Sequence, residues 1–150
     1  AKLSIQTLEP YLELTAVIKA ADRVAKDLLG VTFIETEIPT YHPDVKLLQV
    51  LDRKGRHLGM LYTDYNSRPG RKQDGAWMVE LWPQDGINDT RPILCNVFNV
   101  AKQPEGQPTF LTLDQAILLF HERGHALHCL LSQSPLPSFG GTNGPADYIE

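Results

Sequence analysis

The sequence has little cysteine, no long apolar run and no large excess of charge of either sign. Only two of its 150 residues are cysteines, Cys95 and Cys129, and they lie far apart in apolar segments. This spacing disfavours a disulfide framework or a cysteine-based zinc site, and predicts two buried thiols. The formal net charge of −4 provides no basic surface for nucleic acid.

Membrane-spanning segments are also not expected. The longest apolar runs, such as Ala116 to Phe120 and Ala126 to Leu131, are far too short to cross a bilayer. Ala1 to Thr7 lack the cationic-then-apolar layout of a signal peptide. We therefore expect no nucleic-acid partner, no membrane partner and a cytoplasmic location, with the periplasm as the alternative.

Hydrophobic periodicity divides the chain into short elements. Apolar residues at three- and four-residue steps predict a helix from about Pro10 to Leu29, capped by Gly30. Alternation, β-branched residues and turn signals predict strands at Val31 to Glu37, Val45 to Leu51, Leu58 to Tyr65 and Ile93 to Val100. The second and third should form a hairpin around Gly55. Asn66 to Gly75 is expected to be an exposed loop, leading to the short segment Ala76 to Val79.

A second helix is expected to begin after Thr112. The residues Thr112 to Gln115 match a capping box, and apolar residues behind it predict a mostly buried helix to about Gln133. Prolines and glycines then break regular structure, until Asn143 or Gly144 can cap a new helix with Pro145 in its first turn.

The second helix contains the motif His-Glu-x-x-His at residues 121–125. On a helix the two histidines lie about 40° apart around the axis, so both imidazoles can bind one ion. Glu122 lies to one side of the pair, where its carboxylate can accept a proton from water. His121 and His125 are therefore predicted ligands of one Zn²⁺ ion, and Glu122 is the predicted general base.

A third ligand must come from another segment. After the helix, the acidic candidates are Asp147 and Glu150, both near the start of the next predicted helix. His128 lies three residues past His125. We interpret it as a packing residue or as a side chain that hydrogen-bonds to a ligand, and not as a ligand itself. His42 and His57 lie near turns and are interpreted as ordinary loop histidines.

With these motifs in place, the sequence resembles the thimet oligopeptidase family, most of all its bacterial peptidyl-dipeptidases. The resemblance covers nearly the whole chain. It is carried by Leu119 to Glu122, Gly124 to His128, Gly141 to Asn143 with Pro145, Asp147 and Glu150, and upstream by Tyr41 to Val45 and Gly75 to Met78. In that family the third zinc ligand is a glutamate twenty-nine residues after the first histidine, which selects Glu150 in this sequence.

The resemblance implies an α+β fold: a mainly helical, zincin-like catalytic core with a small sheet that contains antiparallel strands. Family members are several times longer and place oxyanion-stabilising and substrate-contacting residues downstream of the third ligand. Residues 1–150 are accordingly expected to form a single partial domain of a larger catalytic domain. Arg123 departs from the family, which usually has an aromatic residue there; if that face is buried, an unpaired guanidinium would be costly.

The function that follows is zinc-dependent hydrolysis of oligopeptides, with release of C-terminal dipeptides as the expected specificity. Two alternatives stay open: an endo-acting oligopeptidase of the same family, and a zinc-binding fragment or divergent relative without catalysis. The sequence assigns no substrate-binding residue.

Overall fold

The computed structural model describes residues 8–104 and 106–150, so Ala1 to Thr7, on which the signal-peptide prediction rests, lie outside it. The described residues begin with the 3₁₀ turn Glu9–Tyr11 and the helix α1 (Leu14–Leu29). Five strands and a second long helix follow, and then two short elements. They are β1 (Thr32–Glu35), β2 (Lys46–Leu51), β3 (His57–Asn66), β4 (Trp77–Trp82), β5 (Ile93–Val100), α2 (Leu113–Leu131), the 3₁₀ turn Pro137–Phe139 and α3 (Ala146–Ile149).

The strands of the described chain form one mixed sheet in the order β1-β2-β3-β5-β4. β3 and β5 pair in parallel, whereas β1 with β2, β2 with β3 and β4 with β5 are antiparallel. β5 is therefore inserted between β3 and β4, although β4 precedes it in the sequence. As a result β4 lies at one edge of the sheet.

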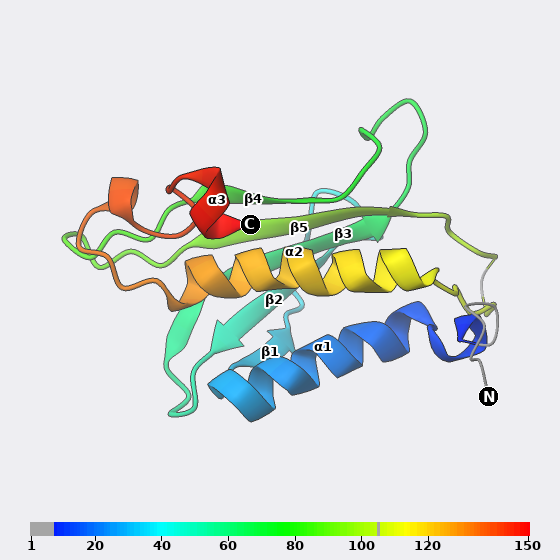
Figure 1. The fold of residues 1–150 in the computed structure, drawn as a ribbon, viewed down its shortest axis with the longest axis horizontal. Coiled ribbons are helices and arrows are strands. Elements are labelled where there is room, and N and C mark those ends of the chain that lie inside the picture. Colours follow the sequence, from blue (N-terminus) through cyan, green and yellow to red (C-terminus); the bar gives the residue numbers. More distant parts are fainter. Residues whose placement is uncertain (1–7, 105) are drawn as a thin grey trace.

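Helices α1 and α2 lie side by side on the same face of the sheet (Figure 1). One apolar cluster lies between α2 and the central strands and includes Leu61, Leu94, Ala126 and Leu130. A second joins α1 to the other half of α2 through Val17, Ala21, Phe98 and Leu119. Burial of these side chains holds α2 against the sheet, with part of its surface left exposed.

The first helix is shorter than predicted. Pro10 belongs to the 3₁₀ turn, and α1 begins after Glu13, whose side chain accepts a hydrogen bond from the Ala16 N–H at 2.8 Å. Gly30 caps the helix as predicted, with a positive φ of 73° that disfavours other residues. The β2–β3 hairpin and the strand Ile93–Val100 are confirmed.

The capping box at Thr112 is confirmed, since both of its reciprocal hydrogen bonds with Gln115 are present. The prediction that this helix is mostly buried was wrong, because Ile117, Leu118 and Phe120 are exposed on its outer face. The predicted caps of the last helix were also wrong: α3 begins at Ala146, with Pro145 in the capping position.

The α+β class is confirmed, but helix does not predominate among the described residues, where helices and strands are of similar extent. Both cysteines are buried and unpaired, as predicted. In the part of the chain that the structure describes, none of the helices has the length and apolar character needed to cross a membrane.

Candidate active site

Two histidines of α2 face the same point in space. His121 and His125 are one helical turn apart, and their Nε2 atoms are separated by 2.9 Å. Their rings meet nearly edge to face, with centroids 4.4 Å apart. Helical periodicity therefore brings the two imidazoles together, as the sequence predicted.

Glu150, which follows α3, lies beside this pair. Its Oε2 atom is 3.1 Å from His121 Nε2 and 3.4 Å from His125 Nε2. The three candidate ligand atoms lie within 4.8 Å of one another. Asp147, the other acidic candidate, lies in the first turn of α3 and is not part of this group.

A tight loop brings α3 back to α2. Gly141 has a φ of 57°, and a Cβ atom there would lie 2.9 Å from Cys129 Sγ and 3.3 Å from Glu80 Oε1. Its N–H donates to Ser132 Oγ at 3.1 Å. Because the loop passes so close to α2 and β4, only glycine fits this position without displacement.

The distances between the three candidate ligand atoms suit an ion with tetrahedral coordination. Ligands held at about 2.0–2.1 Å from zinc are separated from one another by about 3.3 Å. The three measured separations of 2.9, 3.1 and 3.4 Å are close to that value. Two imidazoles and one carboxylate are also a donor set found in catalytic zinc sites, which keep a fourth position open.

Glu122 lies next to the histidines and is only 7% exposed. Burial raises the pKa of its carboxyl group, while His125, His121 and a hydrogen bond from the Met78 backbone act in the opposite direction. The net shift is upward, which favours uptake of a proton. The position and environment of Glu122 thus suit proton transfer.

A cavity of about 250 Å³ opens beside the ligand cluster. Met78 of β4 lines one side, and Thr142, Gly144, Ala146 and Ile149 of the loop and α3 line another, together with His125 and Glu150. The sequence assigned no substrate-binding residue, because this cavity forms only when the edge strand and the final loop meet.

Arg123 faces away from the cluster and is 2% exposed. Its Nη2 atom lies 3.3 Å from Asp22 Oδ1 and donates to the Tyr65 hydroxyl at 3.2 Å, and its guanidinium lies 4.6 Å from the Phe33 ring centroid. The expected cost of a buried guanidinium is therefore partly offset. Asp22 was not identifiable as the partner, because it lies on α1, about a hundred residues away in sequence.

The remaining histidines lie outside the ligand cluster. His128 is exposed on α2 and is not in the group of candidate ligands. The Nδ1 atom of His42 accepts a hydrogen bond from the Asp44 N–H, within a loop. His57 begins β3 beside the hairpin turn.

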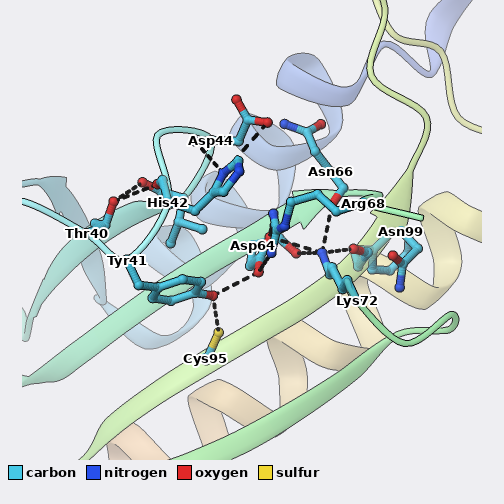
Figure 2. A network of polar contacts seen from close by, with 12 residues as sticks. Thr40, Tyr41, His42, Asp44, Asp64, Asn66, Arg68, Lys72, Cys95 and Asn99 are labelled. Atoms are coloured by element: carbon cyan, nitrogen blue, oxygen red, sulfur yellow. Dashed lines mark hydrogen bonds and ion pairs between the residues drawn. The ribbon is translucent and has the colours of Figure 1, made fainter. Parts of the chain in front are cut away.

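Most of the loop between β3 and β4 is exposed, as predicted, but two of its cations point back onto the sheet. Lys72 is nearly buried, and its Nζ atom donates to the carbonyl groups of Asp64, Asn66 and Phe98 and to the Asp64 carboxylate. Arg68 makes a two-pronged contact with the same carboxylate, as Figure 2 shows. Asp64, Arg68 and Lys72, with Tyr41, form what we call the Asp64 cluster.

The loop that contains Arg68 and Lys72 of the Asp64 cluster continues directly into β4. Asn99 adds hydrogen bonds to the carbonyl groups of Gln73 and Gly75, just before that strand. The four-residue spacing of Asp64 and Arg68 was the one sequence signal for this cluster. It was missed because the segment is rich in glycine, proline and charge, which resembles a solvated connector.

Comparison with known proteins places this arrangement in a family. The profile described as Peptidase family M3 matches residues 1–150. The chain belongs to peptidase family M3. This confirms the resemblance to the thimet oligopeptidase family.

Individual M3 proteins support the assignment. The chain is 40% identical to the dipeptidyl carboxypeptidase of Salmonella typhimurium and 39% identical to that of Escherichia coli, over 95% of its length in both cases. It is 30% identical to the oligopeptidase A of Salmonella typhimurium over 99% of its length. The chain spans 21% to 22% of the length of these relatives.

Proposed function

We propose that this chain carries the active centre of a zinc peptidase that hydrolyses oligopeptides and releases C-terminal dipeptides. The observation that carries the proposal is the convergence of His121, His125 and Glu150 within 4.8 Å, beside the buried carboxyl group of Glu122. Membership of peptidase family M3 supports the same reaction class.

Each residue has a distinct role in the proposed reaction. His121, His125 and Glu150 would hold one zinc ion, which would lower the pKa of bound water to about 7 and polarise a peptide carbonyl. Glu122 accepts a proton from the attacking water at its carboxylate and donates it to the leaving amine. The cavity beside Met78 and Ile149 receives part of the peptide next to the scissile bond.

The role of Glu122 is tested by Glu122→Gln in the full-length protein that contains this chain. The amide is similar in size but cannot accept the proton, so we expect zinc stoichiometry to stay at about one while kcat falls by at least about a hundredfold. The measurement pairs cleavage of a blocked oligopeptide with metal analysis. A variant that keeps most of its kcat would reject the general-base role.

Release of dipeptides is supported by the relatives named dipeptidyl carboxypeptidase. Product analysis on one peptide with a free and then an amidated C-terminus tests it. We expect sequential dipeptides from the free form and little cleavage of the amidated form. Equal internal cleavage of both would instead support an endo-acting enzyme, the alternative suggested by relatives named oligopeptidase A.

The second alternative is zinc binding without catalysis. It is motivated by Arg123, which departs from the family and whose buried guanidinium lies on the same helical turn as Glu122. Zinc stoichiometry and peptide cleavage measured on residues 1–150 alone, beside the full-length protein, separate the two. Zinc without cleavage in the full-length protein would favour this alternative.

A further inference from the structure

Asn96 is a polar residue in the middle of an apolar surface. It lies on β5 with Leu94 and Phe98 two residues to either side, so all three face α2. Leu94 and Phe98 belong to the two apolar clusters, and Asn96 is 2% exposed. An amide at such a place costs free energy that an apolar side chain would avoid.

The side chain of Asn96 binds the backbone of Glu122. Its Nδ2 atom donates to the Glu122 carbonyl oxygen at 2.8 Å. That carbonyl can only accept, which fixes the orientation of the amide. The Oδ1 atom of Asn96 is buried and has no hydrogen-bond partner among the described residues. Asn96 Nδ2 is therefore hydrogen-bonded to the residue that carries the proposed catalytic carboxylate, whereas Asn96 Oδ1 has no partner among the described residues.

The register of the sheet places a residue of β4 directly beside Asn96. Asn96 pairs directly with Met78 of β4, and the Met78 backbone lies close enough to the Glu122 carboxylate to oppose the rise in its pKa. One cross-strand pair thus contacts Glu122 twice. Asn96 binds its backbone, and the Met78 backbone lies near its side chain.

We propose that Asn96 is a positioning residue for the active site, an inference that rests on the proposed function. Its amide sets the height and rotation of the catalytic turn of α2 over the edge of the sheet, so that the Glu122 carboxylate stays against β4 beside the cavity. Asn96 acts through Glu122 and does not itself touch substrate. A misplacement of about 1 Å in such a group can reduce a rate by about a hundredfold.

Asn96→Leu in the full-length protein tests this role. Leucine has the same branching and the same number of heavy atoms as asparagine, but it cannot donate to the Glu122 carbonyl. We expect kcat to fall about 10- to 100-fold, with KM changed less than threefold and zinc stoichiometry unchanged. Because a buried unpaired oxygen is also removed, Tm should stay the same or rise. In the metal-free protein, amide hydrogen exchange across residues 119–127 should become faster.

Leu94→Ala is the matched control on the same face of β5. It opens a cavity against α2 but leaves the Asn96–Glu122 hydrogen bond intact, so Tm should fall while kcat stays within about threefold. A purely structural role for Asn96 predicts that its variant behaves like this control. An Asn96→Leu protein with wild-type kcat, or one that loses Tm and kcat together, overturns the inference.

Wild type and Glu122→Gln assayed in parallel separate this inference from the proposed function. If wild type fails to cleave peptides, both are rejected. If wild type cleaves, Glu122→Gln does not and Asn96→Leu does, only the positioning role of Asn96 fails.

Discussion

At the scale of single residues, position decides which carboxylate lies with the two histidines in the candidate ligand cluster. After α2 the sequence offers Asp147 and Glu150, and spacing alone left both open. Glu150 lies beside the histidines because the four-residue helix α3 turns it toward α2, whereas Asp147 lies one turn earlier. The difference between the two acids is therefore mainly one of position along the helix axis, by about one turn.

Alanine substitutions at these two acids should have opposite outcomes. Loss of a residue that hydrogen-bonds to a metal ligand typically weakens metal affinity by about 10- to 100-fold. Because Glu150 is proposed as a ligand itself, we expect Glu150→Ala to weaken zinc affinity by more than that. Asp147→Ala should change it less than threefold. Competition with a chelator of known affinity measures both, and equal losses would contradict the assignment of Glu150.

Arg123 and Asp22 should behave as a coupled pair. Asp22→Ala leaves the buried guanidinium without its carboxylate, so we expect a loss of about 3 kcal/mol of unfolding free energy. Arg123→Phe should cost less, because the Asp22 side chain is 31% exposed and can be hydrated. The double variant should be more stable than the sum of the two losses predicts, as urea denaturation can show.

At the level of elements, hydrophobic periodicity predicts helices and strands, but it does not predict the contacts that loops and edge strands make. The helix with the His-Glu-x-x-His motif was predictable, because a capping box and an apolar repeat are local signals. The Asp64 cluster, the Asn96 contact and the cavity beside Met78 were not. Each depends on residues that are far apart in sequence and meet only through strand order.

The Asp64 cluster should make stability depend on pH in the acid range. Burial acts to raise the pKa of Asp64, but hydrogen bonds from Arg68, Lys72 and Tyr41 outweigh it and lower the pKa to about 2. The unfolded chain has the ordinary value of about 3.9. The stabilisation is therefore complete above about pH 5 and is lost as the pH falls from about 4 to 2, with a size of about 2 to 3 kcal/mol.

Urea denaturation of the metal-free protein between pH 5 and pH 2 measures this effect, with Asp64→Asn as the comparison. The difference in unfolding free energy between the two proteins should shrink as the pH falls. A difference that stays constant over this range would contradict the low pKa of Asp64.

At the scale of the whole molecule, the ligand cluster connects parts that few other contacts join. α3 is a four-residue helix, too short to be stable by itself, and it returns to α2 through the loop at Gly141. An ion held by His121, His125 and Glu150 would link the end of the described chain to its longest helix.

Removal of zinc with a chelator should therefore lower Tm and increase hydrogen exchange most strongly across residues 141–150. Binding at a thousand times the dissociation constant contributes about 4 kcal/mol. Glu122→Gln should keep this metal dependence, and Glu150→Ala should lose most of it. Differential scanning calorimetry with and without chelator distinguishes these results. A wild-type Tm that is the same with and without chelator would reject the metal site.

The strand order β1-β2-β3-β5-β4 also constrains how folding proceeds in time. β4 is synthesised before β5, yet within the described sheet its neighbour is β5, so it joins the other strands only through that later strand. The pairing that is distant in sequence is that of β3 with β5, which are separated by β4 along the chain, and such non-local contacts form slowly. The histidine motif can form a helix from local contacts, but Met78 lies near Glu122 only when β5 has brought β4 to the rest of the sheet.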